Sequence, residues 1–326
     1  MAPNDLDEQL TKYLADAHAI EQQAIPQMER AQEIAGDPRL TDEFAKHLVE
    51  TRGHESLVAA RLDARGARPS ALKDLAGKLT GVGFALFAQL NPDTPAKLVA
   101  HAYSYEHMEL AAYDLLGRVA ERAGDAETLA VARQIGEQER TMAVRLEHSF
   151  DRAVEAALRE KSPADLGQQL TRYLTDAHAL EAQAIQLLDK GATMAGAPQL
   201  SAAFEEHLAE TREQQRLVAQ RLEQRGASPS RLKDAALALG ALNWGGFFAA
   251  QPDTPAKLAG FAYAFEHLEI ASYELLSRIA RRAGDAATEQ VAGQILGQER
   301  RAAGLVHSLF EPALDAALAA QGVGAR

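Results

Sequence analysis

The sequence predicts an all-α protein made of two tandem four-helix bundles that pack against each other as a pseudo-dimer. Three observations lead to this prediction. Alanine, leucine, glutamate, arginine and glutamine, which favour helices, dominate a chain of 326 residues that is 47% hydrophobic. The second half of the chain repeats the first at a constant offset of 160 residues. Glycine, aspartate and proline interrupt both halves at matching positions.

The internal repeat predicts the domain boundaries. Residues 9–21 return as residues 169–181, with 10 of 13 positions identical. A repeat of this length cannot be one unit of a solenoid, because solenoid units are only about 20–50 residues long. We therefore expect two domains, residues 1–160 and 161–326, with residues 161–167 as a short join.

Four long helices are expected in the first domain. Gly36-Asp37-Pro38 supplies a terminating glycine, an N-cap and a proline for the first helical position, and Gly124-Asp125 marks a second turn. The expected helices span residues 5–35, 38–65, 94–123 and, after Gly124-Asp125, a stretch that ends near residue 160. The second domain repeats these signals at Gly196, Pro198, Gly226, Thr254-Pro255 and Gly284-Asp285.

The connection between the second and third helices is the longest, with 28 residues from Gly66 to Asp93. Tight turns join the other neighbours, so each pair of helices forms an antiparallel hairpin. A long crossover at this place is typical of ferritin-like bundles, whereas simple up-and-down bundles have three short loops. We expect a short apolar helix after Ser70, and the apolar segment 243–248 to cover the second bundle.

Composition excludes several classes of protein. The chain has no cysteine, which rules out disulfides, thiolate metal sites and cysteine nucleophiles. A net charge of −12 argues against general binding to nucleic acid or anionic membranes. The most apolar stretch, Val82 to Leu90, is too short to span a bilayer, and the acidic amino terminus lacks the apolar core of a signal peptide. We expect a cytoplasmic protein.

Glutamates fall on or beside apolar stripes near the middle of the expected helices. Burying a carboxylate without a partner is costly, and a metal ion would remove that cost. Carboxylates together with imidazoles are the donors of ferritin-like di-metal sites. The candidate ligands in the first domain are Glu21, Glu50, His54, Glu106, Glu109 and Glu139. Those in the second domain are Glu181, Glu210, Glu266, Glu269 and Glu299. The pattern leaves open whether Glu106 or Glu109 points inward.

Other polar residues have a simpler interpretation. Any one of these glutamates, taken alone, is also explained as a paired or solvated side chain. The remaining paired histidines are interpreted as hydrogen-bonding partners of neighbouring helices: His18, His47, His107, His178, His207 and His267. Tyr105 is interpreted as core packing, because Phe265 replaces it in the second repeat.

Four motifs, in this order, carry a family resemblance. They are residues 16–28, residues 47–54, Tyr105-Glu-His-Met-Glu-Leu-Ala-Ala-Tyr113 and Glu137-Gln-Glu139. With them the chain resembles the YciF/DUF892-type branch of the ferritin-like superfamily, over nearly its whole length and as two copies. The resemblance implies a ferritin-like fold and an association with stress responses, while the biochemical activity of that family is poorly defined.

The chain departs from the usual ferritin-like ligand pattern, which has Glu-x-x-His on two helices. Glu50 has its histidine four residues on, at His54, and Glu139 has Met142 at the position of the histidine. In the second domain Gln214 stands where the first has His54. The first domain is therefore the better candidate for metal binding.

The favoured function is that of a non-haem di-iron or di-manganese carboxylate protein of stress physiology, with redox chemistry on oxygen or peroxide. One alternative is a non-catalytic structural or stress protein with degenerate metal sites, and a second is a carboxylate-bridged oxygenase with an organic substrate. The sequence leaves open whether the protein is an enzyme. The expected partners are metal ions, with no nucleic acid and no membrane, and a further homo-oligomer is compatible with an intramolecular pseudo-dimer.

Overall fold

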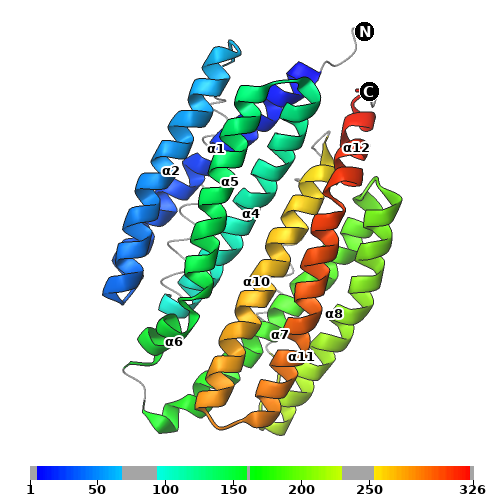
Figure 1. Ribbon diagram of the computed structural model, residues 1–326. Helices are drawn as coiled ribbons and strands as arrows, with labels where there is room; N and C mark the ends of the chain where they lie inside the picture. The colour runs from blue at the N-terminus through cyan, green and yellow to red at the C-terminus, as the bar shows by residue number, and fades with distance from the viewer. Residues whose placement is uncertain (1–5, 68–93, 160–161, 230–252, 324–326) are drawn as a thin grey trace. The chain divides into compact units, whose positions relative to one another are not determined.

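The computed structural model describes residues 6–67, 94–159, 162–229 and 253–323. All the regular structure in these ranges is α-helical, and they contain no strand. The chain divides into two compact units, Met1–Arg159 (unit 1) and Glu160–Arg326 (unit 2), whose helices are labelled in Figure 1. The prediction of an all-α protein with two similar helical halves is confirmed.

The two units contain corresponding helices. In unit 1 they are α1 (Leu6–Ile34), α2 (Pro38–Ala64), α4 (Thr94–Ala123), α5 (Ala126–Glu147) and α6 (Phe150–Leu158). In unit 2 they are α7 (Pro163–Met194), α8 (Pro198–Gln224), α10 (Thr254–Arg282), α11 (Ala286–Ser308) and α12 (Phe310–Ala320). Most long helices begin and end within a few residues of the expected positions.

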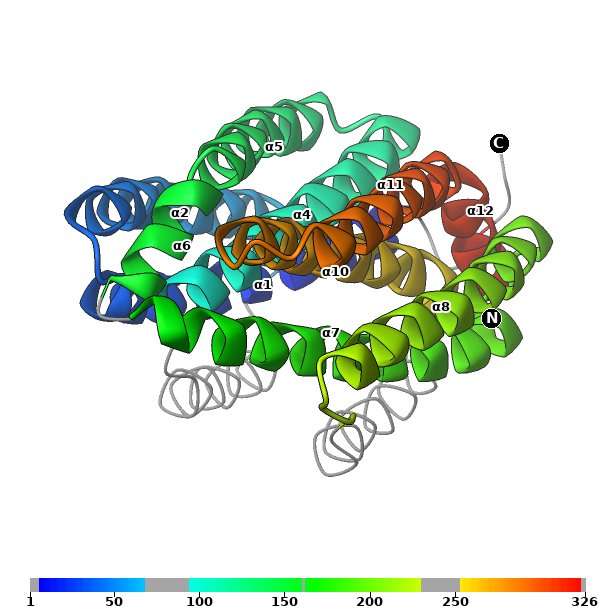
Figure 2. The ribbon, with the colours of Figure 1, turned by 90° about the horizontal axis from the view of Figure 1, so that it is seen from below.

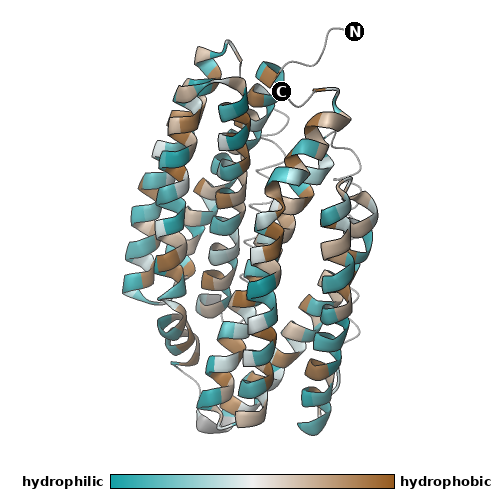
Figure 3. Cartoon of the chain, turned by 45° about the vertical axis from the view of Figure 1, so that its right-hand side comes forward, coloured by the Kyte–Doolittle hydropathy of each residue, from teal (hydrophilic) through white to brown (hydrophobic). Residues whose placement is uncertain are grey.

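The four long helices of unit 1 surround one core. Helix α1 packs against α2 and α4, and α5 packs against the same two helices from the opposite corner. Each helix contributes fully buried side chains, such as Leu10, Phe44, Leu116 and Ile135. Hydrophobic and hydrophilic residues alternate along each helix in Figure 3, as expected for helices with one buried face. Helices α7, α8, α10 and α11 form the same arrangement in unit 2.

The turn between α1 and α2 requires glycine. Gly36 has a φ of +66°, and a Cβ atom there would lie 2.9 Å from Cγ of Pro95 at the start of α4. Gly196 has a φ of +65° and would meet Pro255 at 2.7 Å. A left-handed backbone and a close neighbour both disfavour a side chain. This turn therefore brings the α1–α2 hairpin close to the first turn of the third long helix.

The expected fourth helix is two helices. It is interrupted after α5, and a turn at His148 and Ser149 leads into α6 (Figure 2). The Ser149 hydroxyl donates a hydrogen bond to the Arg145 carbonyl at 2.8 Å, which competes with the regular helical pattern. After the turn Phe150 is fully buried, with its ring 5.5 Å from that of Tyr103. Because of this break, α6, the last helix of unit 1, packs against α4.

Several expectations concern parts of the chain that the structure does not describe. The crossovers, the helix after Ser70 and the segment 243–248 lie outside the described residues. The pairing of the two units as a pseudo-dimer stays a prediction. None of the helices in the described ranges combines the length and apolar character that crossing a bilayer requires.

Asp125 connects the end of α2 to the start of α5. It caps α5 by accepting hydrogen bonds from the Thr128 amide at 2.9 Å and the Thr128 hydroxyl at 2.8 Å. Arg61 and Arg65, at the end of α2, reach the same carboxylate at 3.0 and 2.8 Å. Burial alone would raise the pKa of Asp125. The hydrogen bonds from Thr128 and the charge of Arg61 outweigh burial and lower this pKa to about 2. Asp285 makes the same contacts with Arg221 and Arg225 in unit 2.

Replacing this cap should destabilise the fold. We expect Asp125→Ala to lower the free energy of unfolding at neutral pH by about 1–2 kcal/mol, through loss of the cap and of the arginine contacts. Because the pKa is depressed in the folded state, the difference from wild type should persist above pH ~4 and shrink as the pH falls toward 2. Urea denaturation across this range measures it. The exposed Asp63→Ala is the control, and equal effects of the two substitutions would contradict this account.

Candidate metal centre

Four glutamates of unit 1 are buried near the middle of their helices. Glu21 lies on α1, Glu106 and Glu109 lie on α4, and Glu139 lies on α5. None of these four residues is more than 1% exposed. Carboxylates are almost never buried to this extent without a partner, because water stabilises their charge strongly. The surroundings of these side chains therefore decide what the site can bind.

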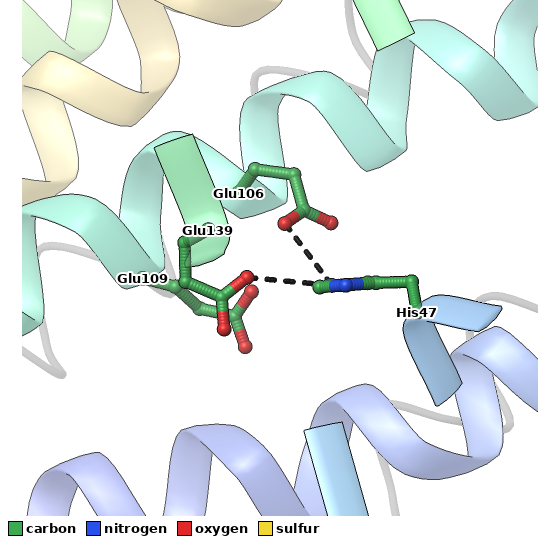
Figure 4. A group of neighbouring side chains, drawn as sticks. All are labelled: His47, Glu106, Glu109 and Glu139. Carbon is green, nitrogen blue, oxygen red and sulfur yellow. Dashed lines mark ion pairs between the residues drawn. The ribbon is translucent and has the colours of Figure 1, made fainter. Parts of the chain in front are cut away.

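The buried glutamates and two histidines form two overlapping groups. The first, here the His47 group, consists of His47, Glu106, Glu109 and Glu139 (Figure 4). The second, the His54 group, consists of Glu21, His54 and Glu139. Within each group the possible ligand atoms all lie within 4.8 Å of one another. Glu139 belongs to both groups, so its two oxygens can serve two neighbouring positions.

His47 is oriented by a residue outside the group. Its Nδ1 lies 3.1 Å from Oε2 of Glu50, and the same Glu50 oxygen is 3.7 Å from Arg145. Its Nε2 points the other way and lies 3.2 Å from Glu106 and 3.3 Å from Glu139. A carboxylate on one ring nitrogen fixes the tautomer and the direction of the other, as it does for many metal-bound histidines. Glu50 thus presents Nε2 to the buried carboxylates.

His54 has a comparable arrangement with the ring nitrogens exchanged. Its Nε2 is 2.9 Å from the amide oxygen of Gln138. Its Nδ1 lies 2.7 Å from Oε1 of Glu139 and 3.8 Å from Oε2 of Glu21. The remaining oxygen of Glu21 accepts a hydrogen bond from the Tyr113 hydroxyl at 2.5 Å. Both histidines therefore direct one nitrogen at the carboxylates and bind the other to a side chain outside.

Most of the carboxylate oxygens have no hydrogen-bond partner among the described residues. This holds for both oxygens of Glu106, Glu109 and Glu139 and for Oε2 of Glu21. The contact between His54 and Glu139 is short, but its angles are not those of a hydrogen bond. Buried acceptors without donors are rare in folded proteins. Here hard oxygen donors and imidazole nitrogens converge, which is the donor set that suits iron or manganese.

The pKa values of these glutamates also reflect the cost of burying several carboxylates together. Burial raises the pKa of Glu21 and of Glu106 to about 8, and burial together with the charges of Glu139 and Glu21 raises that of Glu109 far above its usual range. Glu139 differs: burial opposes the change, but contact with His54 and the charge of His47 lower its pKa. Without a metal ion, bound protons would have to neutralise part of the site at neutral pH.

The structure brings together most of the ligands expected from the sequence. Five of the six candidates in unit 1 belong to the two groups: Glu21, His54, Glu106, Glu109 and Glu139. The sequence left open whether Glu106 or Glu109 points inward, and in the structure both do. Glu50 is outside the groups, with a side chain that is 30% exposed, and it orients His47 instead.

His47 was not among the ligands expected from the sequence. It was interpreted as a hydrogen-bonding partner of a neighbouring helix, but its Nδ1 contacts Glu50 on its own helix α2 and its Nε2 faces the centre. One signal in the sequence could have identified it. His47 and His54 are seven residues apart, which is two helical turns, and Thr51 between them is also buried.

Unit 2 repeats one of the two groups. It consists of His207, Glu266, Glu269 and Glu299, all buried. His207 Nε2 lies 3.1 Å from Glu266 and 3.3 Å from Glu299. Glu210 is 3.4 Å from Nδ1 of His207, outside the group, like Glu50 in unit 1. Glu181 is fully buried and accepts a hydrogen bond from Tyr273.

Three other histidines have partners outside the two groups of possible ligands. His107 and His267 each place Nδ1 2.7 Å from the carbonyl oxygen four residues earlier, on Tyr103 and Tyr263. His18 lies 2.9 Å from Glu55 on α2. These three histidines do not belong to any group of possible ligands in the described ranges. The contact of His18 with α2 agrees with the interpretation from the sequence, whereas the Nδ1 atoms of His107 and His267 bond within their own helices.

A neutral side chain at position 109 should stabilise the metal-free protein. A glutamate whose pKa is raised in the folded state costs stability as the pH rises above its ordinary value near 4.5, because the unfolded chain ionises and the folded chain does not. We expect Glu109→Gln, in the presence of a chelator, to raise the free energy of unfolding by roughly 1–3 kcal/mol at pH 8 and by less at pH 5.

Denaturation curves at the two pH values measure this effect. The exposed Glu137→Gln, on α5, is the matched control and should change stability little at either pH. A Glu109→Gln protein that is less stable than wild type at pH 8 would show that Glu109 has a stabilising partner in the absence of metal.

Comparison with known proteins agrees with the internal repeat. A family model described as "Domain of unknown function (DUF892)" matches the chain twice, over residues 5–159 and 165–319. No solved structure matches the chain significantly. The two matches together cover most of the sequence, and each coincides with one structural unit. The protein therefore belongs to the DUF892 family and contains two tandem copies of its domain.

Proposed function

We propose that unit 1 is a ferritin-like di-metal centre that binds two divalent iron or manganese ions. The observation that carries the proposal is the set of buried carboxylate oxygens without hydrogen-bond donors, converging with two oriented imidazoles. The ions would be held by Glu21, His47, His54, Glu106, Glu109 and Glu139. Glu139, which belongs to both groups, is suited to contact both ions.

Charge balance supports two ions. Four carboxylates carry four negative charges, and two divalent cations carry four positive charges. A single divalent ion would leave two carboxylate charges uncompensated in a buried site, which is costly. All four long helices contribute to the set, as in ferritin-like carboxylate proteins. The distribution differs from the usual one, because both histidines come from α2 and α5 contributes only Glu139.

The function we infer is redox chemistry on oxygen or peroxide in stress physiology, in the cytoplasm. Two adjacent redox-active ions, when bound, would supply one electron each to such a reaction. The residues of the chain would hold and orient the ions: Glu50 fixes His47, Gln138 fixes His54, and the Tyr113 hydroxyl donates a hydrogen bond to Glu21. Glu21, Glu106 and Glu109 are themselves no more than 1% exposed, which limits access of bulk water to the centre.

One observation favours the alternative of a non-catalytic protein without metal. His47 and His54 lie within ion-pair distance of the carboxylates, and the charges of Glu106 and Glu139 raise their pKa values although burial opposes this. Two imidazolium ions can balance only two of the four carboxylates. The alternative therefore requires two protonated glutamates in the resting protein, whereas metal binding requires none.

Metal addition should stabilise the protein. After removal of metal with a chelator, we expect Mn²⁺, or Fe²⁺ without oxygen, to raise the melting temperature, by an amount equivalent to about 2.7 kcal/mol when the free ion is at about 100 times its Kd. Glu139→Gln should abolish most of this gain, because it removes the carboxylate common to both groups. The exposed Glu137→Gln, two residues away, should keep the full gain.

Metal analysis and turnover assays separate the candidate functions. Protein expressed with supplied metal should retain iron or manganese well above trace amounts. Consumption of peroxide or oxygen by the iron-loaded protein would then identify an enzyme, and its absence with metal present would identify a binding protein. No retained metal, with no thermal shift on addition, would refute the proposal and leave the structural alternative.

A further inference from the structure

The two units differ at one position in the centre. His54 of unit 1 corresponds to Gln214 of unit 2, at the constant offset of 160 residues. Both side chains are 1% exposed. His54 contacts Gln138 and Glu139, and Gln214 contacts the matching Gln298 and Glu299 at 3.4 and 2.5 Å. The glutamine therefore occupies the place of the histidine and has the same neighbours.

The exchange changes what this place can bind. A neutral imidazole offers a nitrogen lone pair, the common metal-ligand atom of histidine. The amide nitrogen of Gln214 has no such lone pair and donates a hydrogen bond to Oε1 of Glu299. That oxygen corresponds to Oε1 of Glu139, which in unit 1 faces His54. In unit 2 the position has thus lost a nitrogen ligand, and the neighbouring carboxylate oxygen is occupied by the amide.

The other position is retained in both units. His47 Nε2 lies 3.2 and 3.3 Å from its two glutamates, and His207 Nε2 lies 3.1 and 3.3 Å from the corresponding pair. Both oxygens of Glu269, like both of Glu109, are buried without a hydrogen-bond partner among the described residues. The chemical argument for an ion beside His47 therefore applies without change to His207.

We propose that the chain contains a two-ion centre in unit 1 and a one-ion centre in unit 2, and that residue 54 or 214 sets this difference. The inference rests on the proposed function, since it concerns how many ions each site holds. Unit 2 would bind one ion at His207, Glu266, Glu269 and Glu299. It would lack the second ion because Gln214, whose amide nitrogen is hydrogen-bonded to Glu299, offers a neutral amide oxygen in place of the imidazole nitrogen.

Exchanging the two residues tests the proposal directly. Each substitution introduces the side chain that the other repeat already accommodates, so we expect both variants to fold. Native mass spectrometry of protein loaded with Mn²⁺ counts the ions per chain. We expect about three ions in wild type, about two in His54→Gln and about four in Gln214→His, from the groups present in each unit. The double variant His54→Gln/Gln214→His should return to about three.

Electron paramagnetic resonance of the same samples gives an independent measure. Wild type should show the hyperfine signal of an isolated Mn²⁺ together with a signal from an exchange-coupled pair. His54→Gln should lose the coupled signal and keep the isolated one. Gln214→His should lose the isolated signal. The exposed Glu137→Gln should behave as wild type in both measurements.

The outcomes distinguish failure of the inference from failure of the proposed function. Four ions in wild type, or counts that do not respond to either exchange, would overturn the inference while leaving a metal centre in place. No bound ion in wild type or in any variant would overturn the proposed function and the inference with it. If Gln214→His does not fold, the loss of one ion and of the coupled signal in His54→Gln still decides the question.

Discussion

The structure of unit 1 depends on how four buried carboxylates are neutralised. A bundle of this size gains its stability from apolar side chains such as Leu10, Phe44 and Ile135, and the same interior places charges where water cannot reach them. Each unpartnered buried carboxylate opposes folding by several kcal/mol or retains a proton. Two histidines compensate part of this cost. Bound cations would compensate the rest, and they turn an unfavourable arrangement into a binding site.

The rest of the fold holds the helices so that these side chains meet. Asp125 ties the end of α2 to the start of α5, and Gly36 lets the α1–α2 turn approach the start of α4. The contacts of Glu50 and Gln138 then orient the histidine rings. Because these supports occur in both repeats, the geometry of unit 2 follows that of unit 1. The replacement of His54 by Gln214 changes the chemistry of one position and leaves the surrounding packing in place.

The sequence predicted the helices well because their ends are encoded locally. Gly36-Asp37-Pro38 and Gly124-Asp125 mark turns that lie where they were expected. The break at Ser149 was missed, because it depends on a side-chain hydrogen bond and on the burial of Phe150 against Tyr103. Helical periodicity could not decide between Glu106 and Glu109, since α4 packs against α1, α5 and α6 and has no single inward line. Tertiary contacts also determine that His47, and not Glu50, is a candidate metal ligand. Arg145 holds Glu50 at the edge, which no pattern within α2 could reveal.

Anomalous diffraction from crystals grown with Mn²⁺ tests the central claim most directly. Data collected at the manganese absorption edge locate each ion without reference to activity. The account predicts two anomalous peaks inside unit 1, one among His47, Glu106, Glu109 and Glu139 and one among Glu21, His54 and Glu139. Peaks confined to exposed carboxylates, with none among these buried residues, would contradict it.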